Sequence, residues 1–166
     1  MNDEEKSIVL ARIKDKICET MKIIQGMSYE PESVSSQEFY DWMTGEIFSE
    51  DKTTLRDVLG NENLMLHELV EISELKKMGR KIDKRVIVDS PKEVIYKAHF
   101  FAQEFEMNYA LKKEDYFWVK LRLGHHKKVL DDDPNLPEDL RPVAQAIYAR
   151  FLKTEKEDPY RHYDID

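Results

Sequence analysis

Apolar residues recur in this chain at steps of three and four, which is the spacing of one face of an α-helix. The first such run predicts a helix from about Asp3 to Gln25, with Gly26 as its stop. Only 5 glycines and 6 prolines interrupt the 166 residues, a balance that favours long helices over a strand-and-turn fold. The spacing and the composition together predict an all-α fold.

Capping and breaking residues set the expected bounds of the other helices. The side chain of a serine, threonine, asparagine or aspartate before an apolar run can accept from free backbone amides. The expected caps are Ser35, with Glu38 completing a capping box, Thr53 or Thr54, Asn61, Ser90 and Asp139. The further helices are expected at 35–48, 54–60, 61–78, 90–112, 114–130 and 139–152. The two on either side of Gly60 can merge, so we expect a single-domain helical bundle of about six helices over residues 1–154.

Three further stretches receive their own predictions, two of them outside these helices and one within the helix at 114–130. Val86-Ile87-Val88 reads as a short extended segment, and residues 155–166 read as a polar, loosely held C-terminal tail. His125 and His126 are adjacent and therefore point in different directions on a helix, so we expect them on an exposed basic surface.

The net charge and the number of cysteines limit the expected binding partners and the expected cellular compartment. The chain is acidic, with a net charge of -8, which argues against duplex nucleic acid or an anionic membrane as a whole-domain partner. No apolar run approaches the ~20 residues needed to span a bilayer, and the N-terminus is acidic where a signal peptide is basic. Cys18 is the only cysteine and has no internal partner for a disulfide, so we expect a cytoplasmic protein.

The helix at 61–78 carries the first candidate site. His67 and Glu71 are four residues apart and share a face that Glu74 continues, opposite the helix's own apolar arc, so this face is expected to be solvated. Glu68 falls inside the apolar arc. The stretch resembles the HExxH helix of zinc proteases, but Glu71 stands where the second histidine belongs.

The helix at 90–112 carries the second candidate site. His99 and Glu106 share a band that apolar residues flank on both sides, with Gln103 beside it, so the band is expected to be enclosed. A buried histidine and a buried carboxylate must be paired with each other or bound to something else. The pair is therefore either a structural contact or part of a metal or catalytic site.

Two families of helical metalloproteins offer comparisons, and the chain matches neither. Di-iron bundle proteins use Glu-x-x-His pairs, whereas Leu64 and Tyr96 stand three residues before the two histidines. Glu68-Leu69-Val70-Glu71 resembles half of the magnesium motif of all-helical nucleotide pyrophosphohydrolases. Their second motif is missing, because Met107 stands where the aspartate after Glu104 is required.

Three functional hypotheses remain open. The leading one is a divalent-metal site for Zn, Mn, Fe or Mg in a metal-dependent hydrolase, which requires the two histidine helices to be neighbours. Its metal ligands are His67, Glu71, Glu74, His99 and Glu106, with Glu68 as the catalytic residue and Gln103 as a residue that supports the ligands without binding the metal.

The alternatives need no catalytic centre. One is a non-catalytic helical module that forms a homo-oligomer or binds a protein partner through apolar helix faces. The other is binding of RNA or a phosphate ligand by the basic segment, which consists of Lys76, Lys77, Arg80, Lys81, Lys84 and Arg85. These cations also have an ordinary explanation, since they follow a helix C-terminus and oppose its dipole.

Overall fold

The computed structural model describes residues 1–49, 51 and 53–163, and throughout these residues the chain is helix and loop, with no strand. The all-α prediction is confirmed. The described residues form eight α-helices rather than about six, because the helices on either side of Gly60 stay separate and Val86–Asp89 is helical rather than extended. The last three residues of the expected C-terminal tail, 164–166, lie outside the described part.

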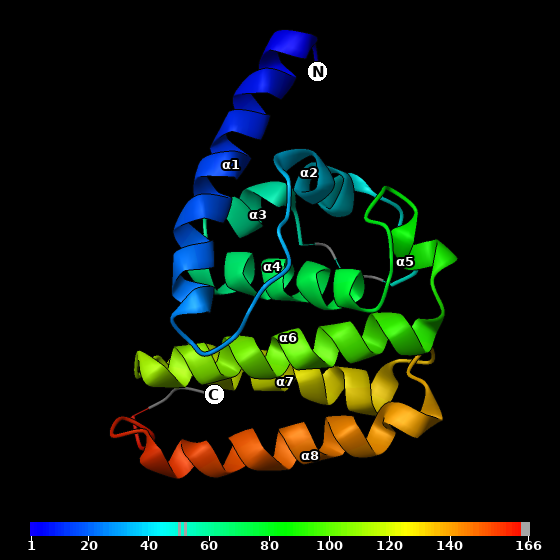
Figure 1. Ribbon diagram of the computed structural model, residues 1–166. Helices are drawn as coiled ribbons and strands as arrows, with labels where there is room; N and C mark the ends of the chain where they lie inside the picture. The colour runs from blue at the N-terminus through cyan, green and yellow to red at the C-terminus, as the bar shows by residue number, and fades with distance from the viewer. Residues whose placement is uncertain (50, 52, 164–166) are drawn as a thin grey trace.

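The helices have the following bounds along the chain. They are α1 (Asp3–Gln25), α2 (Ser36–Thr44), α3 (Leu55–Leu59), α4 (Glu62–Lys77), α5 (Val86–Asp89), α6 (Lys92–Lys112), α7 (Tyr116–Asp132) and α8 (Arg141–Leu152), with 3-10 helices at Glu138–Leu140 and Lys153–Glu157. Figure 1 shows α4, α6 and α8 stacked in successive layers, with α1 crossing steeply over one end and the first turns of α1 extending beyond the body. The helix with the first candidate site therefore lies next to the helix with the second.

Local capping explains where several of these helices begin. The Ser35 hydroxyl accepts from the amide of Glu38, and the Glu38 carboxylate accepts from the amide of Ser35, so the predicted capping box is present. Thr54 and Asn61 cap α3 and α4 as expected. These three boundaries depend on neighbouring residues alone, which is why the sequence identifies them.

Two predicted caps are wrong. Ser90 does not cap α6, whose N-cap is Pro91, because the Ser90 hydroxyl instead accepts from Arg80 Nε at 2.9 Å. Asp139 does not cap α8 either, since residues 138–140 form a 3-10 turn that leads directly into the helix. In the first case a partner ten residues away competes with the local motif.

Two apolar cores share α6. One face of α6, including Ile95 and Ala102, packs with α1, α2, α3 and α4. Another face, including Phe100 and Met107, packs with α7 and α8. Between these two apolar stripes α6 carries His99, Gln103 and Glu106, so its polar residues lie along the boundary between the cores.

No helix in the described part of the chain combines the length and the apolar character required to cross a membrane.

Candidate metal centre

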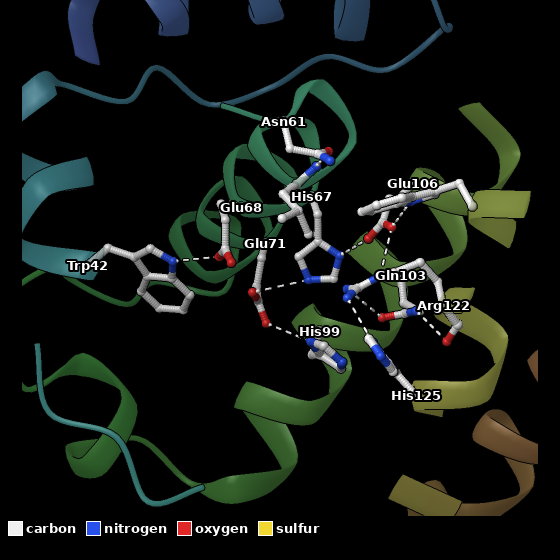
Figure 2. A network of polar contacts seen from close by, with 12 residues as sticks. Trp42, Asn61, His67, Glu68, Glu71, His99, Gln103, Glu106, Arg122 and His125 are labelled. Carbon is white, nitrogen blue, oxygen red and sulfur yellow. Dashed lines mark hydrogen bonds and ion pairs between the residues drawn. The ribbon is translucent and has the colours of Figure 1, made fainter. Parts of the chain in front are cut away.

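The packing of α4 against α6 brings the two sequence-predicted histidines together. The ring centroids of His67 and His99 lie 5.0 Å apart, with the planes tilted by 59°. Figure 2 shows both side chains pointing into the space between the two helices, where Glu71 reaches them from α4. The structure thus meets the condition that the leading hypothesis required of the two helices.

His67, Glu71 and His99 present three convergent donor atoms. Glu71 Oε2 lies 3.5 Å from His67 Nε2, and Glu71 Oε1 lies 3.2 Å from His99 Nδ1. One donor atom from each of the three residues lies within 4.8 Å of the other two. Two imidazole nitrogens and one carboxylate form a donor set that proteins use for zinc and for non-haem iron.

The expectation that His67 and Glu71 lie on a solvated face is wrong. They are only 3% and 6% exposed, because α4 is packed on both sides: its apolar arc faces α1 and the short helices, and its polar face meets α6. Glu106 is fully buried, and the side chain of His99 keeps 31% of its exposure. The polar cluster of His67, Glu71, His99 and Glu106 is therefore interior, with His99 at its open edge.

A chain of hydrogen bonds fixes the inner side of the cluster. His67 Nδ1 lies 2.8 Å from Glu106 Oε1. Glu106 Oε2 accepts from Trp118 Nε1 at 2.6 Å and pairs with Arg122 Nε at 2.9 Å. Gln103, predicted as a supporting residue, contacts Arg122 rather than a histidine: its side-chain amide donates to the Arg122 carbonyl at 3.4 Å, and its side-chain oxygen accepts from a terminal nitrogen of Arg122 at 3.5 Å.

These contacts decide how the cluster is charged. Burial lowers the pKa of His67, but hydrogen bonds to Glu106 and Glu71 raise it more, to about 10, so without a metal the ring is protonated on both nitrogens, with Nδ1–H directed to Glu106 and Nε2–H to Glu71. Burial alone would raise the pKa values of Glu71 and Glu106. Hydrogen bonds from His67 outweigh it at both residues, with His99 also bonding Glu71, and both pKa values lie below the ordinary range.

Glu68 is held apart from these ion pairs. Its carboxylate accepts from Trp42 Nε1 at 2.8 Å, and Figure 2 shows it beside Glu71. Burial and the charge of Glu71 raise the pKa of Glu68 to about 7, although His67 and the bond from Trp42 oppose the rise. A carboxyl group with a pKa near neutrality can both give and accept a proton under physiological conditions.

A cleft of about 780 Å³ opens onto the cluster. His67, Glu68, Glu71 and His99 line its inner part, and residues of α7 and of the loop after α2 line the rest. The volume is in the range of small-molecule binding sites. A smaller pocket of about 290 Å³, between α7 and the end of α8, contains none of the cluster residues.

Glu74, also predicted as a ligand, is not brought to the cluster. Its carboxylate accepts from the Tyr29 hydroxyl and lies 3.7 Å from Lys77 Nζ. Glu74 shares the face of His67, but it stands seven residues and thus about 10 Å further along α4, where Tyr29 takes its carboxylate.

The basic segment lies at the surface near the end of α4, and neighbouring acceptors neutralise most of it. Lys76 pairs with Glu38 at 3.1 Å, and Arg85 pairs with Glu46 at 2.6 Å. The remaining contacts are Lys77 with Glu74, Lys84 with Asp41, and Arg80 with the Ser90 hydroxyl. Lys81 is exposed. Most of the basic side chains proposed to bind an anion are thus already bound to carboxylate or hydroxyl groups of the protein.

Sequence reasoning missed three residues of α7. Trp118 and Arg122 hold Glu106, and His126 is 2% exposed and bonded through Nε2 to the Ala144 carbonyl at 2.7 Å, rather than lying on a basic surface. The three stand four residues apart and share one helix face. Hydrogen-bond donors at four-residue spacing among the apolar residues of α7 could have predicted that this face packs against the polar cluster.

Comparison of the chain with known protein families, with curated proteins and with solved structures found no match.

Proposed function

We propose that the protein is a metal-dependent hydrolase in which His67, Glu71 and His99 bind one divalent cation. The observation that carries this proposal is the convergence of the three donor groups at the inner end of a cleft, with one atom of each within 4.8 Å of the other two. Three protein ligands leave coordination positions for water and substrate, as catalytic metal sites require.

The contact between His67 and Glu106 supports a metal-binding role. When Nδ1–H of a histidine donates to a carboxylate, the lone pair of Nε2 is directed to the metal and the ring is held in orientation. His67 Nδ1 lies 2.8 Å from Glu106, and its Nε2, whose proton a bound cation would displace, is the atom that faces Glu71. Trp118 and Arg122 in turn hold Glu106, so the supporting contacts extend over three helices.

The donor set narrows the choice of cation. Imidazole nitrogen suits zinc and iron, whereas magnesium and manganese prefer oxygen ligands. Two nitrogens and one carboxylate therefore favour Zn²⁺ first, Fe²⁺ next and Mn²⁺ after them. Only small side-chain shifts are needed, because ligand bonds of ~2.0–2.2 Å place neighbouring donor atoms about 3 Å apart.

Glu68 supplies the proton transfer in this proposal. A bound divalent cation would make water a nucleophile at neutral pH by lowering its pKa. Glu68 lines the same cleft, stands outside the ligand set and is held by Trp42. It would take the proton from that water and pass it to the leaving group.

Metal analysis of untagged protein tests the ligand set. We expect one equivalent of Zn²⁺, Fe²⁺ or Mn²⁺, together with a rise in melting temperature, since a ligand at 100 times its Kd stabilises a fold by about 2.7 kcal/mol. Glu71→Gln and His99→Gln should lose both effects. Glu74→Gln is the matched control, because Glu74 lies one turn further along α4 and contacts Tyr29 instead.

The catalytic assignment requires a separate measurement. Glu68→Gln should retain the metal and lose about 10²- to 10⁴-fold in turnover of p-nitrophenyl ester substrates, the range of general acid–base catalysis. A protein that holds no metal and shows no melting shift with any of the three cations would overturn the proposal. The cluster would then be a structural ion-pair network.

A further inference from the structure

The cleft beside the polar cluster has walls of opposite charge. Glu68 and Glu71 on α4 form one wall, while Arg122, His125 and Lys128 on α7 form the other. The three basic residues stand three apart, so they follow one face of α7 along the cleft. The acidic wall suits a cation, and the basic wall suits an anion beside it.

The guanidinium of Arg122 is held in orientation, but its terminal N–H groups have no short hydrogen bonds within the described residues. Its Nε is fixed 2.9 Å from Glu106, and its side chain keeps 14% of its exposure within the cleft lining. The two terminal nitrogens make only long contacts, at 3.4 Å to His125 Nδ1 and 3.5 Å to Gln103 Oε1. A guanidinium held in this way directs its free edge to an oxyanion, which it can bind through two parallel hydrogen bonds.

Lys128 extends the positive field from Arg122 along the cleft. Within the described residues, Lys128 has no ion-pair partner, unlike Lys127, which pairs with Asp131 at 2.6 Å. Burial and the charges of Arg122 and Lys128 lower the pKa of His125, so this side chain stands between the two cations as a neutral imidazole whose ring N–H can donate a hydrogen bond to an anion. Arg122 and Lys128 make this part of α7 locally positive on a protein whose net charge is negative.

The rest of the cleft is largely apolar. Phe48, Ile95 and Tyr96 line it beyond the charged walls, and the rings of Phe48 and Tyr96 lie 6.1 Å apart. Asp51 and Asp132 also line the cleft, so its field does not favour a long polyanion. The cleft thus combines an anion position with an apolar space of small-molecule size.

We propose that the ligand of this cleft is a small organic anion, whose phosphate or carboxylate group binds Arg122 and Lys128 and whose apolar part lies against Phe48 and Tyr96. The inference deepens the proposed function, because it places the substrate's oxyanion next to the His67–Glu71–His99 site. Anion binding to Arg122 does not itself need the metal, so the two proposals can fail separately.

Indole fluorescence provides the readout. The chain has 2 tryptophans: Trp42 lines the cleft and donates to Glu68, and Trp118 donates to Glu106, the carboxylate that pairs with Arg122. Phenyl phosphate and benzoate are the probes, and benzamide is the neutral control of the same size. We expect saturable fluorescence changes with one or both anions, and none with benzamide, in protein kept metal-free by chelator. Which of the two anions binds more tightly distinguishes a phosphate from a carboxylate ligand.

Variants of the basic wall decide whether the binding is at this site. Arg122→Gln should weaken the anions at least tenfold. Because Arg122 also supports Glu106, the exposed double change His125→Gln with Lys128→Gln is the second test, and it should weaken them several-fold without lowering the melting temperature. Arg150→Gln is the control, since Arg150 pairs with Glu104 on the other side of α6.

Each outcome bears on one proposal. Anion affinities equal to that of benzamide, or unchanged in the double variant, would overturn the anion site even if metal binds stoichiometrically. Anion binding that is lost in both basic-wall variants would support it even if the protein takes up no metal, in which case the hydrolase proposal alone fails.

Discussion

The polar cluster between α4 and α6 and the basic segment after α4 contain the same kinds of charged side chain in opposite settings. In the cluster, Glu106 is fully buried and touches His67, Trp118 and Arg122 at once. In the basic segment, Arg85 is half exposed and pairs with Glu46 and Asp89, which are more than half exposed themselves. The presence of charged side chains alone therefore does not identify a functional site; their burial away from water does.

The difference has an energetic basis. Water already solvates exposed ion pairs, so forming one contributes about 0–1 kcal/mol. A buried charge has given up its hydration, and removing its partner leaves a cost of about 3–5 kcal/mol. We expect substitutions in the two regions to differ accordingly.

The largest effect is expected at Glu106. Glu106→Gln keeps the shape but leaves the charges of His67 and Arg122 without their shared carboxylate. We expect a loss of about 3–5 kcal/mol in the free energy of unfolding, measured by urea titration of metal-free protein. A loss below about 1 kcal/mol, the value for exposed pairs, would remove the contrast between the regions.

A smaller loss is expected where the basic segment meets α2. A Cβ atom at Gly45 would lie 2.6 Å from the Lys84 carbonyl oxygen and 2.9 Å from that of Asp41. The neighbouring amide of Glu46 donates to the same Lys84 carbonyl at 2.7 Å, so the two segments cannot simply separate. Gly45→Ala should cost about 1–3 kcal/mol by overpacking. Gly124→Ala is the control, because nothing lies within 4 Å of its Cβ position.

The pH dependence of stability depends on the buried His126, whose pKa differs between the folded and the unfolded chain. His126 is buried in neutral form: burial and the nearby charge of His99 lower its pKa, although the bond to the Ala144 carbonyl opposes this. Below pH about 6.5 the unfolded chain gains a proton that the folded chain does not, so stability falls as pH falls, by at most ~1.4 kcal/mol per pH unit for this residue.

His126→Gln provides the test of that slope. Glutamine can still donate to Ala144 but does not titrate, so the variant's unfolding free energy between pH 6.5 and 5 should fall less steeply than that of the wild type. Equal slopes would show that His126 accepts a proton in the folded protein.

The smallest effect is expected at Arg85. Arg85→Gln removes exposed pairs with Glu46 and Asp89, and its urea midpoint should match that of the wild type within experimental error. A shift comparable to that of Glu106→Gln would mean that the basic segment is as important to stability as the buried cluster.

Much of the fold follows from the sequence because its determinants are local. The three- and four-residue spacing identifies α1, and the caps at Ser35 and Asn61 depend on residues three positions away. The cap expected at Ser90 is wrong because Arg80, from another part of the chain, takes its hydroxyl. A cap that depends on residues within one helical turn can be predicted from the sequence, whereas a contact from a distant residue that displaces a cap cannot.

The candidate site divides in the same way. Glu106 was expected to be enclosed because apolar residues flank its band on both sides of α6, and this is confirmed. His67 and Glu71 were expected to be solvent-exposed, because a helix with a single apolar arc is expected to expose its opposite face to solvent. α4 instead is covered on both faces, and only the order of the helices in space, which no local pattern encodes, reveals that.

The position of the polar stripe of α6 between two apolar cores has a consequence for local unfolding. If the layer of α7 and α8 opened by itself, Glu106 would lose its contacts with Trp118 and Arg122 and keep only His67. Such a partial opening would also expose the apolar core that α6 shares with α7 and α8. The two cores should therefore behave as a single cooperative unit, with amide hydrogens of α7 exchanging at rates close to those of α4.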